Sequence, residues 1–409
     1  MEMRTPAIKT AHPILYLVLY MPFGAVGGYL SVTLAYQLKQ AGVSTEAIAG
    51  LVALAVLPNV LKVFWAPLVD TVFNAKIWYL AGVVVSGLMV AGIGAMPLGP
   101  ASLAWLAPTI VVINTIVTVT AMGGEVLMAH GTAPHEKGRA GGWSQAGNLG
   151  GGGLGGGLGL WLATHVSPLA AGLVLGGAIV ACALPLLILP AASIEHRHTD
   201  PLKSLLGVAK DVWSIARSRA GLLALFVFVM PLGTNIAGGL MPAIAGDWRA
   251  SADLVALISG VLGGVAAMLG AVVGGYFSDL IDRRGAYVLF GVVQGVCVIA
   301  MAIAPHTPAM FALFALTYQV IGGMAFGAYA AVALEAIGAG AAATKFNLLA
   351  SVANAPLLYC AIIEGWVAKR YGASAMLASE AVMAVAGALL FAAFAALTRP
   401  RRASAAPAA

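Results

Sequence analysis

The chain has 409 residues, of which 61% are hydrophobic and only 9% are charged. Soluble domains carry roughly 25% charged residues, so a soluble fold could not bury this much apolar surface. The net charge of +6 comes from Lys and Arg residues that stand singly in short loops, which argues against nucleic acid as a partner.

Apolar stretches long enough to cross about 30 Å of hydrocarbon follow one another along the whole chain. The first begins near Pro13 and is longer than the core of a signal peptide, so we expect it to remain as a membrane helix. The pattern predicts an all-α integral membrane protein of about twelve helices. The expected spans are 13–38, 45–69, 77–97, 103–130, 138–164, 168–190, 220–246, 253–278, 286–305, 308–337, 343–368 and 373–398.

Loop charges predict the orientation of these spans. An even number places both termini on one side, and sixteen Lys and Arg residues then fall in the segments on that side. Only four lie in the opposite segments, namely Lys39, Arg249, Lys369 and Arg370. Because positive loops stay inside, both termini are predicted to be cytoplasmic, in a bacterial inner (cytoplasmic) membrane.

The longest polar stretch, 191–219, divides six spans from six. It predicts an N-terminal bundle over 1–190, a cytoplasmic linker over 191–219 and a C-terminal bundle over 220–409. His196 and His198 stand beside Arg197, which favours solvated surface residues rather than metal ligands. The following amphipathic segment, with Trp213, is expected on the inner membrane surface.

Two corresponding loops indicate an internal repeat. After the eighth span, Gly275 is followed by Asp279, Arg283 and Arg284, and Asp70 stands at the equivalent place after the second span. This pattern resembles the loop signature of the major facilitator superfamily. The resemblance implies two six-helix halves related by a pseudo-two-fold axis, with helices 1, 4, 7 and 10 around a cavity and these loops governing its gate.

Further stretches resemble a narrower branch, the AmpG muropeptide permeases and acetyl-CoA transporters. The first runs from Pro58 through Lys62 and Pro67 to Asp70. Two others are 136–141, an acidic-basic-Gly-Ala-Gly turn, and 343–349, which opens the eleventh span. The related siderophore-uptake permeases remain an alternative.

Ionisable residues inside spans are costly and mark candidate functional sites. Glu125 in the fourth span is expected to bind a proton or substrate, or else to form a cap or an interhelical bond. Glu335 is a candidate gate or cap, and Glu364 a candidate proton site or interfacial pair with Lys369. Neutral candidates for sugar hydroxyls or amides, each also able to form an interhelical bond, are Tyr20, Asn114, Gln145, Asn148, Asn235, Gln319, Asn347 and Asn354.

The fifth span carries Gly147, Gly151, Gly155 and Gly159 at four-residue spacing. Such a face lets another backbone approach closely, and we expect it at the interface between the two halves. Pro231 in the seventh span is expected to break its hydrogen-bond ladder.

These features predict a secondary active, proton-coupled transporter that imports a polar organic solute, such as an anhydromuropeptide, by alternating access. The expected partners are the solute, protons and the lipid bilayer, with a monomeric chain and no cofactor or metal. Within the same branch, a siderophore-uptake or acetyl-CoA-type permease is the alternative. Outside it, the alternatives are an intramembrane enzyme with Glu125 and His130 as an acid/base pair, and an uncoupled channel or sensor.

Overall fold

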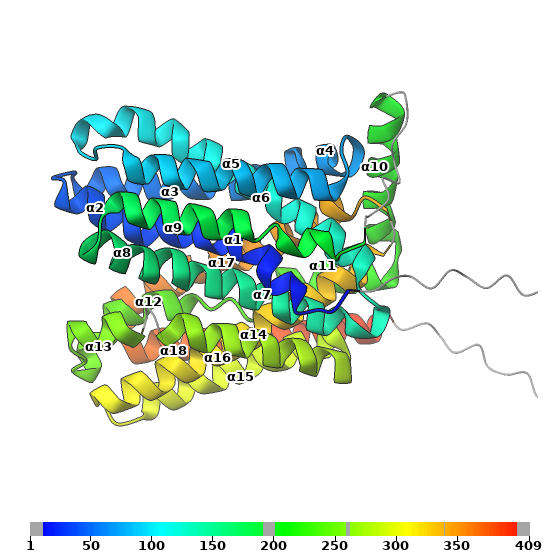
Figure 1. The fold of residues 1–409 in the computed structure, drawn as a ribbon. Helices are drawn as coiled ribbons and strands as arrows, with labels where there is room; N and C mark the ends of the chain where they lie inside the picture. Colours follow the sequence, from blue (N-terminus) through cyan, green and yellow to red (C-terminus); the bar gives the residue numbers. More distant parts are fainter. Residues whose placement is uncertain (1–10, 191–200, 259–261, 339, 399–409) are drawn as a thin grey trace, which may run out of the picture.

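The structure is a computed structural model that describes residues 11–190, 201–258, 262–338 and 340–398, and the regular elements in these ranges are helices. Most of them run roughly parallel in one bundle, and α10 (Pro201–Arg217) crosses the right-hand end of that bundle in Figure 1. The expected all-α membrane fold is confirmed. His196, His198 and both chain termini lie outside the described residues.

Short 3₁₀ or π-helical pieces, labelled η, interrupt or extend the α-helices of the first half. Its elements are α1 (Leu15–Gly28), η1 (Tyr29–Leu34), α2 (Ala35–Gln40), α3 (Thr45–Leu61), η2 (Lys62–Phe64), α4 (Ala66–Thr71), α5 (Ala75–Ala95), η3 (Pro100–Ser102), α6 (Leu103–Gly131), η4 (Pro134–Glu136), α7 (Lys137–Gly153), η5 (Leu154–Leu158), α8 (Gly159–His165), α9 (Pro168–Ala181) and η6 (Leu184–Leu187).

The second half follows α10, begins with short helices and continues with long unbroken helices from α14 onward. Its elements are α11 (Arg219–Val229), α12 (Ile236–Ile244), η7 (Ala245–Trp248), α13 (Ala252–Leu257), α14 (Gly263–Leu280), α15 (Arg283–Ile303), α16 (Pro308–Ile337), α17 (Ala342–Tyr371) and α18 (Ala373–Leu397).

Within the described residues, ten helices are long and apolar enough to cross a membrane, or eleven if the bent pair α10–α11 is one span. Two of the twelve expected spans differ from the simple pattern. The span at 138–164 is a continuous run of α7, η5 and α8, but its many glycines make it less apolar than its neighbours. The span at 220–246 is interrupted between α11 and α12.

The interruption between α11 and α12 has a local cause. Pro231 has no N–H to donate, and Gly233 and Asn235 adopt positive φ angles of 60° and 57°. The Tyr287 hydroxyl donates to the freed Leu232 carbonyl over 2.8 Å. Backbone N–H and C=O groups at membrane depth need hydrogen-bond partners from the protein or from a water-filled cavity. We therefore expect this break to lie on the inner wall of the second half.

The glycines of α7 pack on two sides, and one expectation was wrong. Gly147 and Gly151 of α7, with Gly155 of the following η5, face the backbone of α1 in the same half, not the other half. The contact between halves is made nearer the start of α7, where Gly138 and Gly142 lie against Gly275 of α14. A helix with small residues on two faces can approach a neighbour on each, so four-residue spacing alone could not identify the partner.

The amphipathic helix α10 falls inside the predicted linker. Val208 and Ile215 are buried, whereas Leu206 and Trp213 are exposed. The chain bends by 79° between α10 and α11, which turns α10 across the end of the bundle (Figure 1). We refer to this end of the molecule as the α10 end. The location of α10 on a membrane surface stays a prediction.

Candidate functional site

A cavity of about 390 Å³ lies between the two halves. The first half contributes α1, α3, η2, α6 and α7 to its wall, and the second half contributes α15, α16, α17 and the 232–234 part of the break. Helices 1, 4, 7 and 10 of the expected arrangement therefore all reach the cavity.

Lys62 and Glu125 give this cavity one cationic and one anionic side chain. Glu125 on α6 is only 3% exposed, and its Oε2 accepts a hydrogen bond from Asn347 Nδ2 on α17. Lys62 lies within electrostatic range of Glu125, but its ammonium group forms no hydrogen bond or ion pair with any described residue. Lys62 can therefore bind an anionic group of a solute. The Glu125 carboxyl group, in contrast, is held by a hydrogen bond from the second half.

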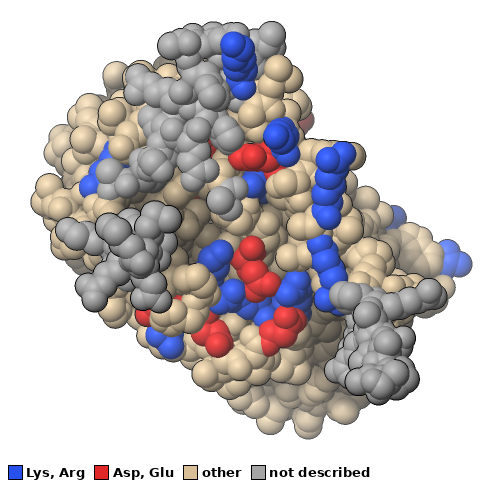
Figure 2. All heavy atoms as spheres, turned by 90° about the vertical axis from the view of Figure 1, so that its right-hand side faces the viewer, with Lys and Arg blue, Asp and Glu red and all other residues tan. Residues whose placement is uncertain are grey.

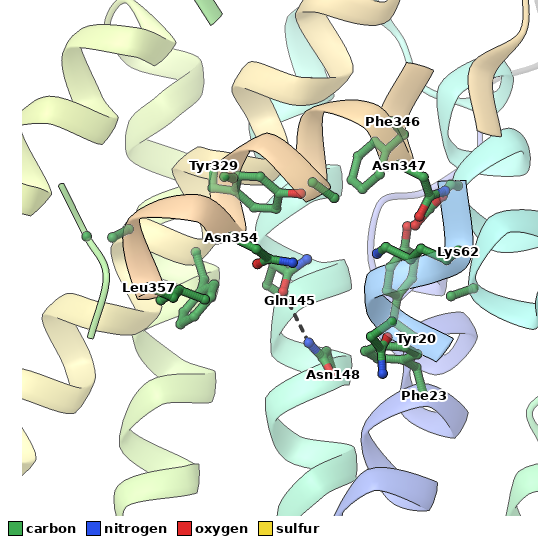
Figure 3. Close-up of a pocket in the computed structure, with 18 of the residues that line it drawn as sticks. Tyr20, Phe23, Lys62, Gln145, Asn148, Tyr329, Phe346, Asn347, Asn354 and Leu357 are labelled. Atoms are coloured by element: carbon green, nitrogen blue, oxygen red, sulfur yellow. Dashed lines mark hydrogen bonds between the residues drawn. The ribbon is translucent and has the colours of Figure 1, made fainter. Parts of the chain in front are cut away.

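Neutral polar groups and aromatic rings complete the wall, as Figure 3 shows. On α7, the Asn148 amide donates to Gln145 over 3.4 Å. Asn354 of α17 also lines the cavity (Figure 3). The hydroxyl of Tyr20 is buried without a hydrogen-bond partner among the described residues. Amides and hydroxyls of this kind can bind sugar hydroxyls and peptide groups, and aromatic faces can pack against sugar rings.

Six of the predicted solute-binding residues line the cavity, namely Tyr20, Glu125, Gln145, Asn148, Asn347 and Asn354. Asn114 does not line it, and its amide donates to the Ile110 carbonyl of its own helix over 2.9 Å.

Asn235 and Gln319 also lie outside the cavity lining. The Asn235 amide donates to Gln319 over 3.2 Å and accepts from Gln294 over 3.1 Å. This small network ties the residue before α12 to α15 and α16, so it supports the break instead of contacting the solute.

Asp279, predicted as part of the gate, binds the opposite half. Its carboxylate accepts from the backbone N–H groups of Gly138 at 2.7 Å and Arg139 at 2.9 Å, at the start of α7. The next helix, α15, is capped instead by Asp282, which accepts from Gly285 N over 2.8 Å. Gly275 explains the difference, because its missing side chain lets α7 reach Asp279.

Asp70 forms the equivalent contact in the other direction. It accepts from Ala343 N at 3.0 Å, Thr344 N at 2.8 Å and Thr344 Oγ1 at 2.6 Å, at the start of α17. Pro67 occupies the first turn of α4, where its missing N–H costs nothing. Each half thus uses one Asp to cap a helix of the other half, and we call these two contacts the latches.

An ion-pair cluster surrounds the Asp279 latch at the α10 end. Arg283 binds Glu335 at 3.0 Å and Asp279 at 3.4 Å, and Arg284 binds Glu335 at 2.8 Å. Figure 2 shows acidic side chains set among Lys and Arg on this end of the molecule. Glu335 therefore belongs to this ion-pair cluster and does not line the cavity.

Five further placements were not anticipated from the sequence. Lys62 was expected in the gate motif but lines the cavity, as do Asn59 and Tyr329. Glu364 is completely buried in the second half, away from the cavity lining, with Glu380 of α18 nearby. Glu380 was missed, although it is an ionisable residue within the expected span 373–398, the same signal that singled out Glu364.

The family model described as Major Facilitator Superfamily matches residues 14–355 of this chain. The chain belongs to the major facilitator superfamily. It is a multi-pass membrane protein and a secondary transporter, not an enzyme, and the expected fold of two related halves is confirmed.

Two curated relatives are anhydromuropeptide permeases, from Escherichia coli K12 and Escherichia coli O157:H7. Each is 24% identical to this chain over 354 residues, a match that covers 81% of this chain and 69% of the relative. The similarity to the AmpG branch inferred from local motifs is therefore found along most of the chain.

Solved structures of the superfamily share the fold. The proton:xylose symporter XylE, solved with 6-bromo-6-deoxy-D-glucose, has a TM-score of 0.65 and 14% identity, over 94% of this chain and 96% of that one. The human organic anion transporter MFSD10 has a TM-score of 0.67 and 14% identity, over 95% of this chain and 100% of that one. At this identity the likeness concerns architecture alone.

Proposed function

We propose that this protein imports an anhydromuropeptide, or a closely similar sugar-peptide solute, by proton-coupled alternating access. The observation that carries the proposal is a central cavity with one cation, one buried carboxylate and several amides and hydroxyls. A sugar joined to a peptide presents matching groups, namely hydroxyls, amides and carboxylates. The similarity to the anhydromuropeptide permeases supports this choice of solute class.

Each part of the cavity has a place in the proposed recognition. Lys62 would bind a solute carboxylate, because its ammonium group has no bonding partner among the described residues. Gln145, Asn148 and Asn354 would bind amides and hydroxyls, and the Tyr329 ring would pack against a sugar. Buried polar groups of this kind reject solutes that leave them unpaired.

The latches suggest how the cavity alternates. Both hold the halves together at the α10 end, so the solute would enter from the opposite end and leave when the latches release. Together with the loop charges, this supports import across a bacterial inner membrane with cytoplasmic termini. We propose that a single chain completes the cycle, since both walls of the cavity come from it.

A thermal-shift screen of the purified full-length protein tests the solute class. The probes are an N-acetylglucosaminyl-anhydromuramyl tripeptide, a ferric siderophore and acetyl-CoA, each compared with buffer alone. A ligand that binds the native state raises the melting temperature, so we expect stabilisation by the anhydromuropeptide only. Stabilisation by the siderophore or acetyl-CoA instead would assign the alternative solute, and stabilisation by none would refute the proposed class.

A further inference from the structure

A pair of buried acidic residues lies in the second half, outside the central cavity. Glu364 on α17 is 0% exposed and Glu380 on α18 is 5% exposed. Their carboxyl groups lie within electrostatic range of each other. Neither residue lines the cavity.

The two carboxyl groups differ in their hydrogen bonding. Glu380 Oε1 accepts from the Tyr318 hydroxyl at 2.7 Å, and Oε2 accepts from Ala237 N at 3.3 Å. Both oxygens of Glu364 are buried without a hydrogen-bond partner in the described part of the chain. None of the ion pairs found among the described residues includes either carboxylate.

The other titratable groups facing the pair are neutral. They are Tyr318 on α16, Cys360 on α17 and Cys297 on α15, and α12 contributes the Ala237 backbone. Two like charges buried together without a cation are too costly, because each loses its hydration and repels the other. At least one carboxyl group of the pair therefore carries a proton, and the pair can hold one or two.

The pair is connected to the cavity wall through the backbone at the start of α12. Ala237 is the second residue of α12, so the bond to Glu380 caps the start of that helix. The three residues 232–234, just before α12, line the cavity. An ionised Glu380 stabilises a helix N-terminus better than a neutral one, so the charge on the pair affects how firmly the break is held.

We propose that Glu364 and Glu380 form the proton-binding site of this transporter, separate from the solute site and linked to it through the start of α12. A proton from one side of the membrane binds a carboxylate oxygen of the pair, and the same proton leaves to the other side later in the cycle. No other bond forms or breaks. The inference rests on the proposed function in one respect, namely that the coupling ion is a proton.

The first test measures proton binding without any solute. Infrared difference spectra of the purified full-length protein, recorded through a pH titration, follow the C=O band of protonated carboxyl groups. We expect the Glu364→Gln and Glu380→Gln variants to lose a titrating component that Glu46→Gln, an exposed isosteric control, retains. Tyr318→Phe keeps both carboxyl groups and should shift the frequency of that component, because Glu380 loses its donor.

Unchanged titration in both Glu variants would overturn the proposal. An unshifted carboxyl band in the Tyr318→Phe variant would also overturn it. This variant keeps the test decisive if a Gln variant fails to fold. Because no solute is present, these outcomes do not depend on whether the solute is an anhydromuropeptide.

The second test separates coupling from solute movement in proteoliposomes. With an anhydromuropeptide, we expect both Gln variants to keep solute exchange within about twofold of wild type but to lose accumulation driven by a pH gradient by at least about tenfold. Accumulation retained by both variants would overturn the proposal. If wild type accumulates the solute on a sodium gradient instead, the proposed proton coupling fails, and the infrared titration still decides whether the pair binds protons.

Discussion

Glu125 places a buried carboxyl group at the boundary between the halves. Its hydrogen bond comes from Asn347 of the second half, while its own helix belongs to the first. The carboxylate is therefore placed where a change of its partner, whether solute or proton, alters the contact between halves. An ionisable group in this position is energetically costly, so we expect it to have a role in the transport cycle.

Replacing Glu125 by Gln tests that role. The amide keeps the size of the side chain but removes the charge, so we expect solute accumulation in proteoliposomes to fall by at least about tenfold, or ~1.4 kcal/mol. Glu46→Gln, in an exposed position, is the control and should behave as wild type. A Glu125→Gln protein that inserts normally, accumulates solute and still responds to a pH gradient would contradict the proposed role.

Lys62 makes a complementary prediction about the solute. A Lys62→Gln variant should bind a carboxylated anhydromuropeptide about tenfold more weakly, because a charge-assisted hydrogen bond contributes about 1.5 kcal/mol or more. An analogue with its carboxyl groups amidated should lose much less. Isothermal titration calorimetry measures both affinities. The control is Lys203→Gln, a change of an exposed side chain on α10. Equal losses for the two solutes would show that Lys62 does not bind the carboxylate.

Among the elements, the start of α17 connects the Asp70 latch to the cavity. Asp70 caps its residues 343 and 344, and Asn347, one turn later, binds Glu125. A rigid helix transmits a small rotation along its length, so release of the latch would move a cavity residue. The start of α7 has the matching position under Asp279, with Gln145 two turns further along the helix.

The glycine contacts of α7 lead to a prediction about the closed gate. An added Cβ at Gly142 would lie 2.6 Å from the Ala271 carbonyl oxygen and 2.8 Å from Gly275 Cα, closer than packing allows. Gly142→Ala should therefore cost about 1–3 kcal/mol in the closed arrangement. We expect a lower melting temperature, whereas Gly153→Ala, with open space around the glycine, should leave it unchanged or raise it. Similar melting temperatures for the two variants would show that α7 and α14 are not in close contact.

For the molecule as a whole, we propose that the two latches act on one equilibrium between closed and open at the α10 end. Asp70→Asn and Asp279→Asn each weaken a cap, at a cost of about 1 kcal/mol each. The latches share no side chain, so the two costs should add in the double variant.

Cysteine labelling measures this equilibrium. Asn354→Cys, in a background with Cys182, Cys297 and Cys360 replaced, reports access to the cavity. With a membrane-impermeant maleimide inside oriented vesicles, we expect faster labelling in each Asn variant and the fastest in the double variant. Labelling that stays at the wild-type rate in the double variant would show that the latches do not hold the gate.

Properties that depend on short stretches could be predicted from the sequence. Membrane crossing needs only about 20 consecutive apolar residues, so the all-α fold and most spans followed from composition. The family followed from the Asp70 and Asp279 loops and the Pro58-to-Asp70 stretch, since the residues of each motif stand close together in the sequence. Glu125 followed from the cost of an ionisable group in a span.

Only the tertiary structure decided which groups meet. Helices that are apolar on every side carry no periodic signal of their rotation, so the sequence could not separate Gln145 and Asn354, which reach the cavity, from Asn114 and Asn235, which do not. Asp70 and its α17 partner are 273 residues apart, and the α1 partner of the α7 glycines is likewise distant along the chain. The pairing of Glu364 with Glu380 depends on how α17 and α18 are rotated against each other, and the number of protons that this pair holds depends on that packing.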